Sequence, residues 1–267
     1  MLRLSRPTRS FLGAIAIATL AVVASAQAAL LTLDGRQRIG ALVSSPVDLT
    51  VSGSLDWAYW STTSGTLISP FAPTNDKNGG TAISSASIFG GGTGLRGSGS
   101  STTVERYSFT DGTSPGSGTN ASLAGLLFNG DLGSSGGTGN TGAVGKGFQL
   151  TIAGDPLQER LVTLYLGGFA STSSLTLSLN GIAVPLTVSD APAFPNSSPK
   201  QMDIYTLRFK PDSASDLLQV QYIATSVSDV TNGHVGLQAV TVAAVPEPGA
   251  VALLGLGGLA LARRRRR

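Results

Sequence analysis

The sequence contains no cysteine, a single histidine and few charges. Charged side chains make up 12% of its 267 residues. The absence of cysteine excludes disulfide bonds and thiol chemistry, and it removes the usual ligands of a structural zinc site. A chain of this length can bury enough apolar surface to fold without such cross-links. Glycine accounts for 35 of the residues, and serine and threonine are also abundant. This composition favours a loop-rich extracellular β protein over an α/β enzyme.

Basic side chains are scarce in the middle of the chain and concentrated at its two ends. Arg3, Arg6 and Arg9 lie near the start, and five arginines close the sequence. Residues 29–245 carry 10 basic and 14 acidic side chains, so their net charge is near −4 although the whole chain is formally +3. A nucleic-acid-binding protein concentrates lysine and arginine on its folded part. The charge distribution therefore excludes a nucleic-acid partner.

The first 28 residues have the pattern of a secretory signal peptide. Three arginines precede Phe11–Ala26, a run of sixteen residues without a charge. Small residues at Ala24 and Ala26, or at Ala26 and Ala28, then provide a cleavage site of the A-x-A type. The alternative is a permanent N-terminal membrane helix. We interpret residues 1–28 as a signal peptide for export.

The last 23 residues, 245–267, have three parts. Pro246, Glu247 and Pro248 come first, and the two prolines keep this segment extended because each fixes φ and lacks an N–H. Gly249–Ala262 follows with fourteen apolar or small residues, fewer than the ~17–25 that normally span a bilayer. A basic cluster ends the chain and can act as a stop-transfer block on the cytoplasmic side. Its members are Arg263, Arg264, Arg265, Arg266 and Arg267.

This order of parts resembles the PEP-CTERM sorting signal of Gram-negative bacteria. The resemblance implies recognition by an exosortase, a membrane-embedded transpeptidase-like enzyme, and cleavage near Pro246–Pro248. It also implies transient anchoring in the inner membrane, followed by delivery to the cell surface, outer membrane or extracellular matrix of a bacterium that makes exopolysaccharide. The alternative is that the prolines only mark the start of an ordinary membrane helix.

Residues 29–244, called the body below, show alternating apolar residues and no convincing helical stripe. This period of two predicts β-strands. Asn180-Gly181 predicts a two-residue hairpin, since both turn positions need positive φ. We therefore expect an all-β fold: a single β-sandwich domain, jelly-roll-like, flanked by an N-terminal signal helix and a short C-terminal membrane helix. The expected strands are 47–51, 104–109, 148–152, 161–166, 175–179, 203–209, 217–223 and 235–242.

Motifs for catalysis or metal binding are weak. Gly92–Gly97 matches the dinucleotide-binding G-x-G-x-x-G, but the pattern after it predicts a strand where that site needs a helix. His234 lies in a predicted turn, where we expect it to be exposed, and no G-x-S-x-G surrounds a serine. Asp131 and Asp155 can contribute to a calcium site, yet no D-x-D-x-D run supports one. We expect no enzyme activity, no cofactor and no metal.

The best candidate for ligand binding is the aromatic segment from Asp56 to Trp60, which holds both tryptophans. In a strand, Trp57 and Tyr59 lie on one face, and Asp56 and Trp60 on the other. Trp57 is expected to anchor the core. Trp60 is expected to point outward, where its indole can stack on a sugar ring while Asp56 accepts hydrogen bonds from hydroxyls.

Four short segments resemble secreted bacterial β-sandwich domains that are similar to galactose-binding-like jelly rolls. This resemblance supports the fold more than an activity. The segments are Leu55–Trp57 with the aromatic pair after it, Tyr107–Gly112, Gly145–Phe148 and Leu164–Gly167.

Together these features predict an exported, surface-sorted protein that associates with exopolysaccharide through the aromatic segment. One alternative is a structural or adhesive matrix protein without a specific ligand, which a buried Trp60 favours. The other is a glycoside hydrolase, which needs two carboxylates about 5–10 Å apart in a cleft.

Overall fold

The computed structural model describes most of the body but not the two terminal signals. Residues 1–27 and 247–267, where the signal helix and the short membrane helix are expected, lie outside the described residues. Within the described part of the chain, no helix is long and apolar enough to cross a membrane. The described residues are 28–60, 66–67, 70–91, 95–97, 103–119, 127–129, 144–180, 182–189, 193–197 and 199–246.

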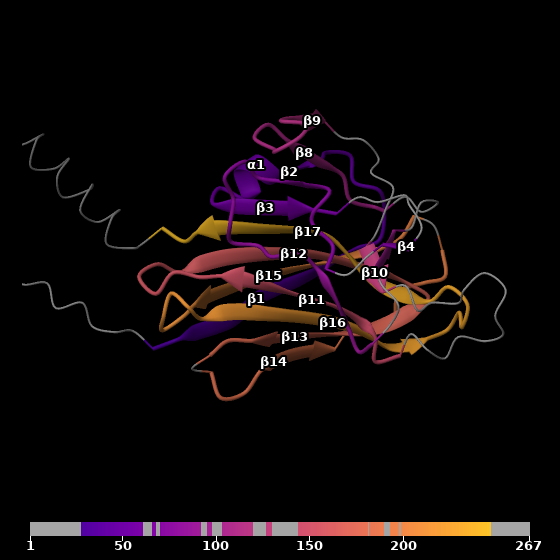
Figure 1. Cartoon of the computed structure of the whole chain (residues 1–267). Coiled ribbons are helices and arrows are strands. Elements are labelled where there is room, and N and C mark those ends of the chain that lie inside the picture. Colours follow the sequence, from indigo (N-terminus) through magenta and orange to yellow (C-terminus); the bar gives the residue numbers. More distant parts are fainter. Residues whose placement is uncertain are drawn as a thin grey trace, which may run out of the picture.

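Two large sheets face each other, and a smaller layer covers the outer side of one of them (Figure 1). The larger sheet has nine strands in the order β1-β15-β12-β17-β10-β7-β4, with β3 and β5 branching from β17. Its strands are β1 (Leu30–Ile39), β3 (Asp56–Tyr59), β4 (Thr66–Leu67), β5 (Asn75–Asp76), β7 (Leu95–Gly97), β10 (Leu127–Asn129), β12 (Arg160–Phe169), β15 (Met202–Lys210) and β17 (His234–Ala244).

The second sheet has five strands in the order β14-β13-β16-β11-β6, all antiparallel. They are β6 (Ser87–Phe89), β11 (Gly147–Ala153), β13 (Ser171–Ser178), β14 (Leu186–Ser189) and β16 (Leu217–Val227). The outer layer consists of a three-stranded sheet and one helical turn. Its elements are β2 (Val47–Asp48), α1 (Leu49–Ser52), β8 (Tyr107–Phe109) and β9 (Gly118–Thr119).

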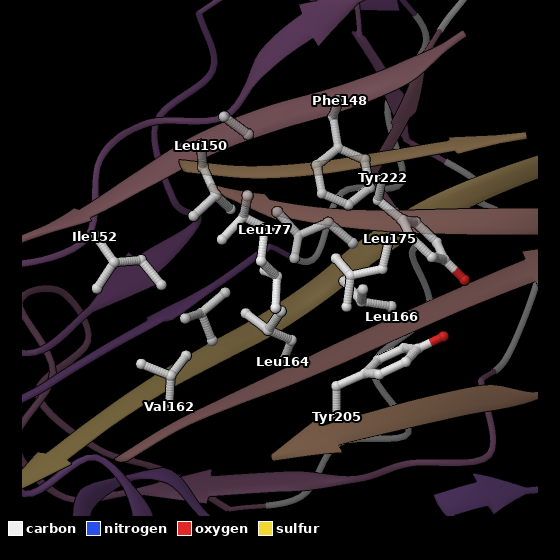
Figure 2. Packing of buried hydrophobic residues seen from close by; sticks show 14 of the residues in the cluster. Phe148, Leu150, Ile152, Val162, Leu164, Leu166, Leu175, Leu177, Tyr205 and Tyr222 are labelled. Atoms are coloured by element: carbon white, nitrogen blue, oxygen red, sulfur yellow. The ribbon is translucent and has the colours of Figure 1, made fainter. Parts of the chain in front are cut away.

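The sandwich core forms because alternate side chains of both large sheets point inward. In β15, Tyr205, Leu207 and Phe209 are buried between the sheets, and Thr206 and Arg208 lie on the opposite face. Figure 2 shows side chains of β11, β12, β13, β15 and β16 meeting in this layer. The all-β, sandwich-like prediction is confirmed.

Consecutive strands mostly alternate between the two sheets. From β11 to β17, only the connection from β13 to β14 stays within one sheet, and the others cross the sandwich. The long predicted strands agree with β11, β12, β13, β15, β16 and β17 to within a few residues.

Two local predictions are wrong. The chain leaves the extended conformation after Asp48, because the Asp48 carboxylate accepts a hydrogen bond from Val51 N (3.2 Å) and caps α1 in place of the expected strand. The hairpin of β13 and β14 is antiparallel as expected, but Leu177 faces Leu186, so the connection runs well beyond the predicted Asn180-Gly181 turn.

Both described chain ends lie at one end of the sandwich, which we call the exit end (Figure 1). Leu30 of β1 pairs with Lys210, and Arg160 of β12 pairs with Ala244 of β17. Segments 49–55, 154–159 and 211–217 reach the same end, as do residues 179–180 and 182–185. The sorting signal therefore begins where the body's own N-terminus emerges.

Candidate functional site

The aromatic segment forms β3, which pairs with β17 through Asp56–Tyr59. Trp57 and Tyr59 face the outer layer, and Ala58 and Trp60 face the sandwich core. The predicted division into two faces is confirmed, as is the burial of Trp57. Both faces are covered, however: the outer layer lies over Trp57 and Tyr59, and the sandwich core encloses the Trp60 side, which was expected to be open.

Trp60 is fully buried, so the prediction that it points outward is wrong. Its Nε1 donates a hydrogen bond to the carbonyl of Phe71 (3.4 Å), and its ring belongs to the sandwich core. The exposed indole face that sugar stacking requires is therefore not available at this residue.

Asp56 is also buried, with 3% of its surface exposed. One carboxylate oxygen accepts hydrogen bonds from Ala82 N (2.7 Å) and Ile83 N (3.0 Å), which fixes the loop after β5. Burial raises the pKa of Asp56, and these backbone donors oppose that rise. A Cβ on Gly80 would lie 2.0 Å from the same carboxylate, so only glycine fits beside it. Asp56 thus has a structural function here, in place of the expected one toward hydroxyls.

Aromatic rings join the larger sheet to the outer layer. Trp57 packs on Phe109 with ring centroids 4.8 Å apart, and Tyr107 lies between Tyr59 (5.3 Å) and Tyr165 (5.4 Å). Offset and edge-on ring pairs of this kind add stability beyond the area they bury. The aromatic segment therefore holds two layers of the protein together.

Asp111, which follows β8, connects the outer layer to the larger sheet. It accepts hydrogen bonds from Thr50 of α1 (2.8 Å) and from the Trp57 indole (2.8 Å), and it forms an ion pair with Lys77. Partial burial raises its pKa, but the hydrogen bonds from Lys77, Thr50 and Trp57 outweigh this and leave the pKa lowered. No local sequence pattern predicts these contacts of Asp111, since its partners are 34 to 61 positions away.

Two arginines of the edge strand β1 hold a buried carboxylate. Asp203 of β15 is inaccessible to solvent, and it accepts hydrogen bonds from Arg36 (2.8 Å) and from both Nε and Nη2 of Arg38. The Arg38 guanidinium also lies 4.1 Å from the centre of the Phe194 ring. Ion pairing and cation–π contact together fix β1 to the sandwich.

His234 is buried at the start of β17, so the prediction of an exposed turn histidine is wrong. Its Nδ1 lies 2.6 Å from the carbonyl of Asn232 and must therefore carry the proton, which leaves Nε2 to accept from Lys200 Nζ (2.9 Å). The ring stacks on Phe169, with centroids 5.9 Å apart. Burial, followed by the Lys200 charge, lowers the His234 pKa to about 3, and burial lowers the Lys200 pKa to about 7.

Glu105 is a further buried acid, and no sequence motif predicted it as a candidate site residue. No described residue donates a hydrogen bond to its Oε2, and burial raises its pKa despite a hydrogen bond from the Arg106 backbone. It adds to the burial effects that raise the pKa of Tyr107 and Tyr165.

The remaining motif candidates do not form a site. Leu95–Gly97 of the G-x-G-x-x-G match is strand β7, and the preceding three residues lie outside the description. Asp155 forms an ion pair with Arg160 (3.2 Å), and Asp131 is not described. Among the described residues, no group of three or more histidine, aspartate or glutamate side chains is placed to hold a metal ion.

The sorting triplet begins directly after the last strand. β17 ends at Ala244 opposite Arg160, and Val245 N extends the ladder by one hydrogen bond to the carbonyl of Glu159 (3.0 Å). Pro246 is exposed and cannot donate, so the ladder stops there. Glu247, Pro248 and Arg263–Arg267 lie outside the described residues. The body therefore presents Pro246, the first residue of the triplet, at its surface directly after the last strand.

The PEP-CTERM protein-sorting motif matches residues 244–267, which contain the triplet, the apolar run and the arginine cluster. The chain carries a PEP-CTERM sorting motif. This motif directs export and sorting to the cell surface by way of the membrane, and it implies processing by an exosortase. Comparison with curated proteins finds no match.

The burial of Lys200 makes the stability of the PEP-CTERM protein's body depend on pH. An unfolded lysine titrates near pH 10.5, whereas Lys200 in the folded chain titrates near 7. Between these values the unfolded chain binds more protons, so stability rises with pH. We expect the free energy of unfolding of the wild type to rise across this window relative to Lys200→Met, by at most about 1.4 kcal/mol per pH unit. Urea unfolding of both proteins at several pH values measures this change. A difference in unfolding free energy between them that stays constant with pH would contradict the lowered pKa of Lys200.

Proposed function

We propose that the protein is a structural component of the bacterial cell surface or extracellular matrix. It is exported, held for a time at the inner membrane by its tail, cut by an exosortase near Pro246–Pro248, and then delivered to the surface or matrix. The observation that carries the proposal is the pairing of a PEP-CTERM motif with a body whose aromatic residues are used internally. No catalytic step is part of the proposal.

The structural role is preferred over sugar recognition at the aromatic segment. Asp56, Trp57, Tyr59 and Trp60 are all buried. The side-chain polar atoms of Asp56, Trp57 and Trp60 serve the loop after β5, Asp111 and Phe71 in the contacts described above. A carbohydrate site made of these four residues would need the outer layer or the sandwich to open. The carboxylates of Asp56, Asp111 and Asp203 likewise serve structural contacts, which gives little support to a glycoside hydrolase.

Association with exopolysaccharide is the second candidate function. The connections that cross between the two sheets from β11 to β17 support a jelly-roll-like fold, and galactose-binding-like domains share that architecture. Contacts with polysaccharide would then use the exposed serine- and threonine-rich surface, with many weak hydrogen bonds in place of an aromatic platform. Fold alone does not carry a binding activity, so this candidate depends on direct measurement.

The first test changes the sorting triplet. Replacing Pro246, Glu247 and Pro248 together by alanine should leave the chain uncut in the membrane fraction, because the extended, unpaired segment that an exosortase would recognise is lost. Cell fractionation with an antibody against the body measures this. Pro46→Ala, which removes an exposed proline of the body, is the control and should be processed normally. A triple variant that is still shortened and released would contradict exosortase-dependent processing at this triplet.

The second test separates a structural Trp60 from a sugar-binding one. Trp60→Phe should lower the free energy of unfolding by about 1–3 kcal/mol, as core changes usually do. It should leave retention of the folded protein on the producing bacterium's own polysaccharide unchanged. Phe148→Leu, in the same core but away from β3, is the matched control for lost stability. Loss of retention with Trp60→Phe but not with Phe148→Leu would support the ligand role and contradict the structural one.

A further inference from the structure

We propose that the exit end of the sandwich docks on the lipid surface of the membrane for as long as the tail remains inserted. This inference rests on the proposed anchoring of the PEP-CTERM tail. It assigns a lipid contact to one end of the body, which the sorting motif by itself does not do.

The tether between the body and the apolar run is very short. The hydrogen bond from Val245 to Glu159 holds the chain to β12, and the uncharged run begins at Gly249. Four residues span at most about 14 Å even when fully extended. The polar headgroup region occupies roughly 5–8 Å on each side of a bilayer. An inserted tail therefore brings the exit end of the body to the headgroups.

The exit end also carries most of the exposed apolar side chains. Eight large hydrophobic residues are exposed in the described part of the chain, and five of them belong to segments that reach this end. Leu157 and Val184 are each 75% exposed, and the others are Val51, Leu55 and Leu217.

The pairing of the strands shows this placement directly. Leu217 opens β16 opposite Ala153, the last residue of β11, and Leu55 N bonds to Val242 near the end of β17. The other three exposed residues lie toward the opposite end, next to strand termini far from Ala244. These are Leu42, Val144 and Val230.

The charges of the exit end favour insertion of apolar side chains over electrostatic attraction. Arg160 is paired with Asp155, and Arg208 with Asp34 (2.7 Å). Lys210 is followed by Asp212 and Asp216 in the neighbouring loop, so the described residues of this end mix both signs of charge and form no basic patch for anionic lipids. A few leucine and valine side chains bind an interface weakly on their own, but a short tether makes the contact intramolecular and raises its effective concentration. Cutting the tether near Pro248 would then release the body.

Single cysteines can test this contact because the chain has none of its own. Leu157→Cys and Val184→Cys, labelled with an environment-sensitive dye, report on the exit end, and Val144→Cys and Val230→Cys are the matched controls at the opposite end. Leu254→Cys reports on insertion of the tail. The exported chain with its tail intact is reconstituted into phosphatidylethanolamine–phosphatidylglycerol vesicles, and quenching by aqueous iodide is measured.

Docking predicts a blue shift and a severalfold loss of quenching for the labels at 157 and 184, with no change at 144 and 230. Equal quenching at all four body positions, with the label at 254 protected, would overturn the docking and leave the anchoring intact. Quenching at 254 as well would overturn both. Because the vesicles contain no processing enzyme, protection at 157 and 184 reports contact with lipid itself.

Discussion

The last strand, β17, is the element on which the three layers depend. Its residues from His234 to Val242 are buried, with one face toward the sandwich core and the other toward the outer layer. One edge pairs with β12, and the other pairs with β3 and β10. Gln238 of β17 also accepts a hydrogen bond from the Tyr107 hydroxyl (3.1 Å), which links the strand to β8. Removing β17 would expose both cores at once.

This position of β17 connects folding with sorting. β17 is the last strand of the larger sheet along the chain, and the sorting motif begins at its final residue, Ala244. The pairing of Ala244 with Arg160 and the hydrogen bond from Val245 to Glu159 make the first two residues of the motif part of the folded sheet. The end of the fold and the start of the sorting motif thus share the same residues, Ala244 and Val245.

The sequence predicts the long strands well because alternation is a local property. The strands β11, β12, β15, β16 and β17 bury alternate residues in one common core, and the sorting motif is readable from a few adjacent residues. The outer layer was not predicted, because alternating apolar residues do not show whether the second face of a strand is also covered. In the aromatic segment both faces are covered, at Trp57 and at Trp60. The contacts of Asp111, and those of Lys200 with His234, join residues far apart in sequence, so no local pattern reveals them.

Mass spectrometry of the protein recovered from native cells and their extracellular material tests the central claim most directly, since it reads both termini of the mature chain. Our account predicts an N-terminus near Ala29 and a C-terminus near Pro248, just beyond the end of β17, with Gly249–Arg267 removed. An intact Arg267 in the membrane fraction would mean that the tail is a permanent anchor, and it would contradict the proposed delivery to the surface or matrix.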